Sequence, residues 1–573
     1  MNRFSVLCLA AFVVLCLFNS AGAQESPWPA DVEGFVEPKP GEHPRLLFRQ
    51  SDLAEIRKRA KTPEGQRLVK RLEVLLNGTH GLSLPEHYNN SSKAYETKKK
   101  DFPVGTYTIS HVAGYGMLYQ ITGDKVYAEL GKECFEKALN FQRDVDDRYS
   151  FRNPGGALRA GPSLGWYALG YDLCYNGWDE QTRIKFAKAI AEYNEGRNQS
   201  LAELVRGSRH MPASNHWGMQ VGGGALAVLA IMNDPGVDMK KIKPLLAESQ
   251  KAMIRNVTEG FGDGGFFNEG DGTGVMASHI VYLTAIQAWR VAGGKDFASP
   301  RPNVPNTVLK FVVQTLPVDD KPVFPSRGAY DHNVWSRSGI SGPGTFCMGF
   351  GVVDQKHKPA LLWLYNRVSK KLDEAAGGPF ETASEYPHRA ILSLVNWPLD
   401  MKEADPAESV GLTLADRQKG EYRFFAMRNR YQDANDILVT VQTQPTRGWH
   451  KSATSGQLWV WALGKQQKIG RLRGKTSTWK PAADGSAILT VEGTSAAVDF
   501  SGASGAEGMI VMAGPGAEGD KSIELNGQTL KFSFYGGKAP ELSVSGGNVV
   551  AGKQRIAYDG TDLSLETFRP KSR

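Results

Sequence analysis

The residues of this chain best suited to chemistry are Asn215 and His216, an amide and an imidazole side by side just before the small-residue apolar run 221–231, with a second imidazole, His210, in the same polar stretch. The run predicts a buried helix, which would place both groups at the mouth of a helical core. Removal of a carbon-bound proton next to a carboxylate needs such groups, because the amide hydrogen-bonds the carboxylate and the imidazole accepts or returns the proton. The alternative is a helix N-terminus capped by Ser214 or Asn215, with His216 satisfied in the core.

A glycine-rich stretch further along the chain, 262–274, carries acidic residues in what the sequence predicts to be a loop. Glu269 or Asp271 would bind a hydroxyl group or orient a histidine there, and the alternative is a solvated turn. His279 follows at helical spacing, which favours a histidine satisfied in the core. The apolar neighbours of Tyr282 likewise favour core packing over a catalytic role.

The elements that must position these groups are mostly helical from about residue 51 to about residue 400. Ser51 and Asp52 cap the first helix. Clear helical patterns cover 114–141 and 163–193, and the second predicts a helical hairpin broken at 177–179. Further helices are expected at 221–233, 238–257, 275–292, 305–315 and 356–372. Helical pairs stacked over this length predict an α/α solenoid closed into a toroid.

The character of the sequence changes near residue 405, where Asp405-Pro406 marks a linker. Short strand-like runs follow, punctuated by Gly, Asp and Asn, at 422–427, 437–442, 457–463, 487–491, 509–512 and 530–535. They predict an antiparallel β domain, most simply a sandwich. The fold class is therefore α+β multidomain: an N-terminal incomplete (α/α) toroid over 24–404 followed by a C-terminal antiparallel β-sandwich over 405–573.

The N-terminus predicts export. An apolar run over 4–18 and the small residues Ala21-Gly22-Ala23 fit a signal peptide, 1–23, and the run is too short to span a membrane comfortably. We expect a soluble periplasmic or secreted protein with no membrane span. The cysteines that remain after cleavage, Cys134, Cys174 and Cys347, are widely spaced and odd in number, so they form neither a disulfide framework nor a zinc signature.

The composition is that of an ordinary globular protein, with 41% hydrophobic and 22% charged residues. The formal charge of +8 fits an acidic polymer as a partner, since net charge acts on association. No Lys-Arg tract or aromatic RNA-binding signature is present, which argues against nucleic acid. The sequence carries no signal for the oligomeric state.

These features together resemble the heparinase II/III-like polysaccharide lyases and their alginate-lyase relatives. Asn215-His216 is similar to the family's Asn or Asn-His motif, and 262–270, Gly-Asp-Gly-Gly-Phe-Phe-Asn-Glu-Gly, is similar to its Asp-Gly-Gly segment. The helix ending Gly170-Tyr171-Asp172 resembles their α/α toroid. The succession 422–428, 436–439, 448–450 and 458–464 is similar to the start of their β domain, where a turn rich in glycine and histidine faces the toroid cleft.

The resemblance implies an exported lyase that cleaves an acidic, uronic-acid-containing polysaccharide by β-elimination, without a cofactor. Asn215 would hydrogen-bond the sugar carboxylate, and His216 would act as base or proton shuttle. Tyr330 would act as base or acid, because a neighbouring arginine favours its phenolate. His450, in a glycine turn after a strand, is the fourth candidate catalytic residue.

The candidate substrate-binding residues include an aromatic ring that could stack on a sugar and charged groups that suit a sugar acid. They are Trp217, Glu269, Arg327, His332 and Arg337. The last three belong to the polar and aromatic loop 325–337 around Tyr330. The alternative for this loop is a packed surface in which Arg327 and Arg337 pair with Asp331, and the alternative for Trp217 is a place in the core.

The chain departs from the family pattern in two places. No tyrosine lies within 269–274, where the family usually carries one, and the family's His-x-His-x-Asp turn survives only as His450. A metal site at that turn is therefore unsupported, and we expect none. Two other classes stay open: a hydrolase on the same toroid that uses two carboxylates from among Asp263, Glu269 and Asp271, and a non-catalytic glycan-binding protein on the same scaffold.

Overall fold

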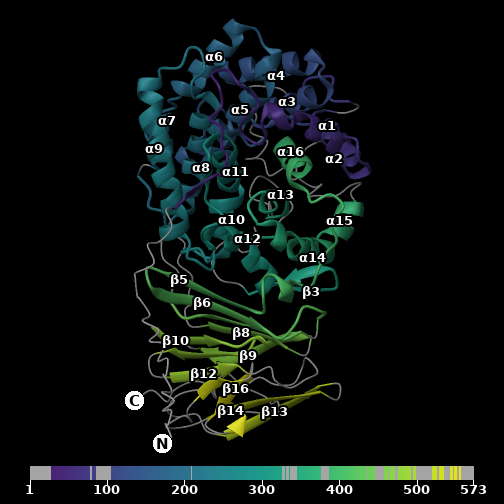
Figure 1. The fold of residues 1–573 in the computed structure, drawn as a ribbon, viewed down its shortest axis with the longest axis vertical. Helices are drawn as coiled ribbons and strands as arrows, with labels where there is room; N and C mark the ends of the chain where they lie inside the picture. Colours follow the sequence, from purple (N-terminus) through teal and green to yellow (C-terminus); the bar gives the residue numbers. More distant parts are fainter. Residues whose placement is uncertain are drawn as a thin grey trace, which may run out of the picture.

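The computed structural model places helices in one half of the molecule and strands in the other (Figure 1). It describes residues 28–77, 80–85, 105–207, 209–325, 330, 334–335, 345–375, 386–434, 436–444, 457–462, 464–471, 475–491, 494–498, 519–525, 528–534, 542–545, 548–551 and 554–555. The predicted signal peptide lies outside these residues. Within the described part, no helix is long and apolar enough to cross a membrane.

The helical half runs from residue 53 to residue 396. Its helices are α1 (Leu53–Ala60), α2 (Pro63–Leu75), α3 (His111–Thr122), α4 (Lys125–Leu139), α5 (Ala157–Cys174), α6 (Glu180–Ala191), α7 (Leu201–Arg206), α8 (Asn215–Ile231), α9 (Met239–Arg255), α10 (Asp271–His279), α11 (Tyr282–Ala292), α12 (Asn303–Gln314), α13 (Thr345–Gly349), α14 (Lys358–Val368), α15 (Lys370–Ala375) and α16 (Pro387–Asn396). The last helix returns to the first ones, because α16 packs against α1, α2 and α3.

The helical pattern over 114–141 corresponds to two helices, α3 and α4. Gly123 ends α3 in the left-handed conformation (φ 78°), which glycine adopts without steric cost. The side chain of Asp124 then accepts the N–H of Val126 and caps α4. Both helices carry many buried apolar residues, so the apolar pattern over 114–141 did not reveal the break.

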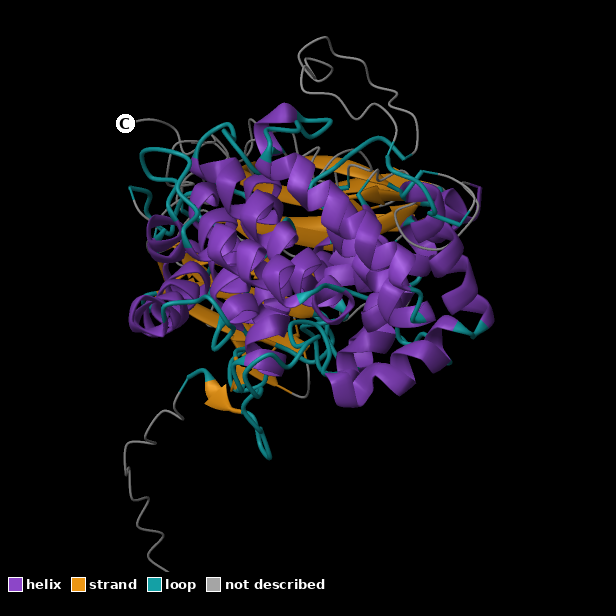
Figure 2. Ribbon diagram, turned by 90° about the horizontal axis from the view of Figure 1, so that it is seen from above, coloured by secondary structure: helices purple, strands orange, loops and turns teal. Residues whose placement is uncertain are grey.

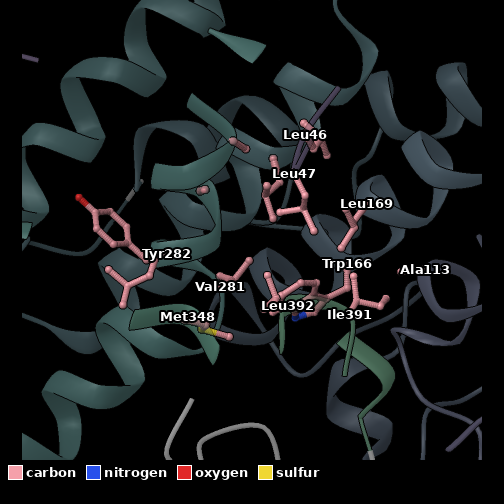
Figure 3. Close-up of a cluster of buried hydrophobic side chains, with 14 of the residues drawn as sticks. Leu46, Leu47, Ala113, Trp166, Leu169, Val281, Tyr282, Met348, Ile391 and Leu392 are labelled. Atoms are coloured by element: carbon pink, nitrogen blue, oxygen red, sulfur yellow. The ribbon is translucent and has the colours of Figure 1, made fainter. Parts of the chain in front are cut away.

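The core of the helical half is built from segments that lie far apart in the sequence. Leu46 and Leu47 from the N-terminal lead-in lie above Trp166 of α5, and Val281, Ile391 and Leu392 surround the same space (Figure 3). These side chains are almost completely enclosed. Removal of this much apolar surface from water is the main contribution that holds the helices together.

Helix α8 is buried along almost its whole length, and its glycine run explains how. A Cβ atom on Gly222 would lie 2.7 Å from the Cα of Tyr282 on α11, and one on Gly223 would lie 1.8 Å from the backbone oxygen of Gly161 on α5. One on Gly224 would lie 2.8 Å from the backbone nitrogen of Val205 on α7. Three neighbouring helices therefore approach the α8 backbone directly, and the run serves helix packing, as its sequence indicates.

The substitution Gly223→Ala is expected to destabilise the protein by about 3 kcal/mol, because the new methyl group would overlap a backbone oxygen that cannot move away by itself. Chemical denaturation of the variant and the wild type measures this difference. In an exposed helix the same change stabilises by up to about 1 kcal/mol. A gain in stability would therefore contradict the close approach of α5 and α8.

The N-terminal lead-in is anchored by a buried polar network. His43 contacts Asp172 through Nδ1 (2.7 Å) and Asp234 through Nε2 (3.0 Å). Arg45 donates to Asp234 and to the backbone oxygen of Met232. Burial raises the pKa of Asp234, but the hydrogen bond and the charges from His43 and Arg45 outweigh burial and lower it overall. The network fixes the extended segment against the ends of α5 and α8.

The β half begins with a five-stranded antiparallel meander in the order β5-β6-β7-β8-β9. Its strands are β5 (Thr413–Gln418), β6 (Glu421–Arg428), β7 (Leu438–Gln442), β8 (Gln457–Ala462) and β9 (Lys465–Arg471). The other strands of this half are β10 (Thr476–Pro481), β11 (Ala487–Val491), β12 (Thr494–Val498), β13 (Gly519–Leu525), β14 (Gln528–Phe534), β15 (Leu542–Ser545), β16 (Asn548–Ala551) and β17 (Gln554–Arg555), all antiparallel. Seen from above, the helices lie over the strands (Figure 2).

The α+β class, with a helical part followed by antiparallel sheets, is thus confirmed. Two short strand pairs also lie in the helical half: β1 (Ala30–Asp31) with β2 (Lys295–Asp296), and β3 (Leu316–Val318) with β4 (Lys321–Val323). The first pair ties the lead-in to the segment after α11. The boundaries of the domains at 24, 404 and 573 stay predictions.

The two halves are joined through the glycine-rich segment 262–268. The carboxylate of Asp416 on β5 accepts the N–H groups of Gly264 (3.1 Å) and Phe266 (3.0 Å). Arg423 on β6 pairs with the other oxygen of Asp416 at 2.7 Å and donates to Asn268 and to the backbone oxygen of Phe266. A Cβ atom on Gly262 would lie 2.3 Å from the Asp416 carboxylate, so the segment needs glycine to reach the sheet.

The substitution Arg423→Ala is expected to lower the free energy of unfolding by about 3–5 kcal/mol, because it leaves the buried charge of Asp416 without its partner. Arg417→Ala is the matched control. Arg417 lies on the same strand as Asp416 and pairs with Asp263 of the same segment, but its side chain is 54% exposed. Its loss should cost below about 1 kcal/mol. Equal losses in the two variants, measured by urea denaturation, would contradict the role of Arg423.

Candidate active site

The N-terminus of α8 lies on the segment that joins the two halves. The Ser214 hydroxyl accepts the N–H of His216 (3.4 Å), and the carboxylate of Glu269 accepts the N–H of Asn215 (3.1 Å). A negative charge at a helix N-terminus is favourable, since the first N–H groups of a helix have no partner within it. Glu269 is fully buried. It therefore positions the start of α8 and with it the two residues that the sequence singles out.

The Asn215 side chain is buried but its hydrogen-bonding capacity is almost unused. Only 2% of the residue is exposed. Its Nδ2 contacts the sulfur of Met276 on α10 at 3.8 Å, a weak acceptor, and its Oδ1 has no hydrogen-bond partner among the described residues. Leaving a buried polar atom unpaired costs on the order of 1–3 kcal/mol. The amide is therefore a group that a ligand could use.

His216 lies beside a second imidazole, that of His210. The two ring centroids are 4.4 Å apart, and both residues are partly exposed. Gln220, fully buried one turn after His216 on α8, donates through Nε2 to Nδ1 of His210 (2.9 Å). Positions four apart lie on the same face of a helix, so His210 covers the face that carries His216 and Gln220. The sequence offered His210 as a second imidazole in the same stretch, and the four-residue spacing of His216 and Gln220 was the signal for Gln220, which was not among the candidates.

Trp217 is part of the packing. Only 3% of it is exposed, and its indole N–H donates to the backbone oxygen of Ala252 (3.0 Å). The guanidinium of Arg255 lies 4.8 Å from the ring centroid, and a Cβ atom on Gly207 would touch the other part of the indole. The ring therefore has no open face for a sugar, and the alternative place in the core describes it better.

The second acid of the glycine-rich stretch, Asp271, is the first residue of α10 and not a loop residue. Its carboxylate is fully buried and binds Nζ of Lys310 (2.5 Å) and Nε2 of Gln314 (2.9 Å). The alternative of a solvated turn is therefore wrong for Asp271 and for Glu269, because both residues are fully buried. Both carboxylates hold helices together, since a buried charge is stable only with such partners.

Tyr330 is the one candidate catalytic residue of its loop that lies within the described residues. It is 46% exposed and has a positive φ of 62°. The other candidates, Arg327, His332, Arg337 and His450, lie outside the described residues, and their roles stay predictions. Tyr282 lies in the core, and its hydroxyl donates to the backbone oxygen of Met253 at 2.6 Å.

Three further imidazoles are enclosed in the helical half. Burial lowers the pKa of His111 to about 3, and burial with the nearby charges of Lys310 and Arg389 lowers that of His279 to about 3. Burial and Arg389 hold the pKa of His388 well below its usual value. All three are therefore neutral at neutral pH. His279 contacts the Ser278 hydroxyl at 2.7 Å, which agrees with the expected core histidine.

No group of three or more His, Cys, Asp or Glu side chains in the described part of the chain could hold a metal ion. Cys134, Cys174 and Cys347 are buried, and none of the three forms a disulfide within the described part of the chain.

Comparisons with known proteins give one kind of match. No family model and no curated protein matches the sequence. Three solved structures are similar to the fold: a heparinase III (11% identity, 81% of this chain and 73% of that chain, TM-score 0.38), a mutant of heparan sulfate lyase HepC from Pedobacter heparinus (11%, 91% and 93%, 0.38), and the heparinase III that is the BT4657 gene product (11%, 92% and 87%, 0.36). These values show a distant structural similarity.

The buried imidazoles predict a loss of stability in acid. Between the unfolded pKa near 6.5 and the folded pKa of about 3, the unfolded chain binds a proton at His111 that the folded chain does not, so lowering the pH favours unfolding. From pH 7.5 to pH 5 this amounts to about 2 kcal/mol for His111. In His111→Gln, the free energy of unfolding measured by urea denaturation should fall less between the two pH values than in the wild type, and the difference should be this amount.

The matched control is His80→Asn, because the His80 side chain is 64% exposed and its positive φ suits asparagine. Between pH 7.5 and pH 5, the free energy of unfolding of this control should fall by as much as that of the wild type. An unchanged loss in His111→Gln would contradict the buried, neutral state of His111.

Proposed function

We propose that this protein is an exported polysaccharide lyase that cleaves a uronic-acid-containing polymer by β-elimination. The observation that carries the proposal is the buried amide of Asn215, whose Nδ2 donates only to the weakly accepting sulfur of Met276 and which lies next to His216 on the first turn of α8. We also propose that the helices form an incomplete α/α toroid and that the sheets of the β half form a sandwich.

The chemistry of β-elimination needs three groups. The sugar carboxylate must be neutralised so that charge can build up as the neighbouring C–H bond breaks, a base must take the proton, and an acid must protonate the leaving glycosidic oxygen. In this proposal Asn215 hydrogen-bonds the carboxylate, and His216 takes the proton. A preorganised donor contributes on the order of 3 kcal/mol to such a step.

In this proposal, residues from two further segments of the sequence complete the site. Tyr330, which is exposed, and His450 would contact the sugar ring or carry a proton, and Arg327, His332 and Arg337 would bind its charge. Glu269 belongs to the site through its hydrogen bond to the Asn215 backbone, and we leave Trp217 out because its indole is packed. The net charge of +8 supports an acidic polymer as substrate.

A hydrolase mechanism is less well supported. Such a mechanism needs two carboxylates with a water molecule or a sugar between them. Asp271 is closed off by Lys310 and Gln314, and Glu269 holds the N-terminus of α8. Asp263 is half-buried, and its carboxylate accepts the N–H of Arg417. These three carboxylates therefore already bind other groups of the protein.

The experiment is an absorbance assay against a panel of uronic-acid polymers. Elimination leaves a new C=C bond in the product, and this bond absorbs near the ultraviolet edge. Hydrolysis forms no such bond. Asn215→Ala and His216→Ala should each lower kcat by about 10²–10³-fold, because each removes a group that acts on the transition state. Asn366→Ala, which removes a matched amide on α14 that is bonded to Glu403, should keep full activity.

The result has clear alternatives. Unchanged rates in both site variants would remove this site. Hydrolysis products without the new absorbance would favour the hydrolase, and binding of a polymer without any product would favour a glycan-binding protein. Trp217→Phe separates packing from binding, since it should lose about 1 kcal/mol of stability with the indole hydrogen bond and leave the KM unchanged.

A further inference from the structure

The histidine pair His210–His216 has features that the proposed function does not yet use. The rings lie 4.4 Å apart, so a proton on each would bring two positive charges into contact. The pair therefore favours a single shared proton. Arg209 and Glu269 are charged groups on the neighbouring segments, and Arg255 with Glu259 forms an ion pair at the end of α9. The pair is partly exposed, so it can exchange protons with solvent.

Gln220 makes His210 suited to both states of protonation. In the structure its Nε2–H donates to Nδ1 of His210, which fits a neutral ring that carries its proton on Nε2. Its Oε1 is buried and has no partner among the described residues. A half-turn of the amide would bring this oxygen to Nδ1, where it accepts the second N–H of an imidazolium. An amide can therefore serve either form, which neither a carboxylate nor an ammonium group can do.

The backbone around His210 is held in an unusual conformation. Arg209, just before it, has a φ of 69°, a left-handed conformation that costs a non-glycine residue about 1–2 kcal/mol. The turn that follows is closed by the N–H of Ser214 donating to Met211 (2.9 Å). The fold thus accepts strain in the segment that brings His210 over α8.

We propose that His210 and His216 form an acid–base pair that shares one proton, with Gln220 as the positioning residue of His210. This rests on the proposed function. His216 takes the proton from the carbon next to the carboxylate, the electron pair forms the C=C bond, the bond to the glycosidic oxygen breaks, and the imidazolium of His210 gives its proton to that oxygen. The pair holds one proton before and after, and its transfer from His216 to His210 resets the site.

The position of the pair also defines the substrate class. Two adjacent rings reach the sugar from one side, so the hydrogen and the leaving oxygen must lie on the same face of the sugar ring. D-Glucuronic and D-mannuronic acid units meet this condition when linked through the carbon next to the one that loses its proton. L-Iduronic and L-guluronic acid units place the two groups on opposite faces.

The first test needs no substrate. Protein with ¹⁵N-labelled histidine is titrated by NMR, and the signals are assigned from the His210→Gln and His216→Gln variants. We expect the two imidazoles of the wild type to titrate in two separate steps, and His210 to titrate in a single step in His216→Gln. Independent titration of both rings in the wild type would overturn the shared proton. His80→Asn, which alters an exposed histidine, should leave both signals unchanged.

The second test uses kinetics. His210→Gln should lower kcat by about 10²–10⁴-fold. Gln220→Glu should move the alkaline limb of the kcat/KM profile upward by about one pH unit, because a carboxylate stabilises the imidazolium of His210. Gln220→Met, which fits the same buried space without a charge, should move the alkaline limb downward. This variant keeps the test valid if the glutamate variant misfolds. Identical profiles in wild type and Gln220→Met would overturn the role of Gln220.

The polymer panel separates the two proposals. Poly-D-mannuronate or a D-glucuronate polymer should be turned over at least about tenfold faster than poly-L-guluronate. Full activity of His210→Gln, or a preference for the L-sugars, would overturn the acid–base pair while the lyase activity stands. Absence of the new absorbance from every polymer would instead overturn the lyase, and the NMR titration would still decide whether the pair shares a proton.

Discussion

The buried carboxylate of Asp416 is the group on which the arrangement of the two halves depends. It accepts two backbone N–H groups of the segment 262–268 and pairs with Arg423. A charge without access to water needs all of these donors, so the segment has one position relative to β5 and β6. Glu269 follows directly and accepts the N–H of Asn215. The same short segment therefore holds the sheet on one side and the start of α8 on the other.

Helix α8 begins at this segment and extends into the core. Its glycines let α5, α7 and α11 approach the backbone, and no side of the helix is left for a polar stripe. Polar groups occur only in its first two turns, as Asn215, His216 and Gln220. A site on the first turns of a tightly packed helix is held more firmly than a site on a loop, because the rotamers are limited by packing. This suits a reaction that becomes slower when the reacting groups are displaced by small distances.

The fold retains polar atoms that it does not pair. Asn215 and Gln220 each keep a buried amide oxygen without a partner among the described residues, and each such atom costs on the order of 1–3 kcal/mol. Elsewhere in the core, buried charges such as Asp271 and Asp234 are fully paired. Buried polar atoms without a partner also occur elsewhere in the described core, among them Oδ1 of Asn256 and Oε1 of Gln314. What distinguishes Asn215 and Gln220 is their place beside His216 and His210. A sugar hydroxyl that donates to such an oxygen would recover this cost.

The sequence by itself determined the order of helices and strands, the helix at 221–231 and the packing role of its glycines, because residue spacing and side-chain size act locally. Only the tertiary structure decided that Trp217 is enclosed and that Asp271 pairs with Lys310. These outcomes depend on which surfaces meet, and a contact between residues tens or hundreds of positions apart leaves no mark in the local pattern on which the sequence analysis relied.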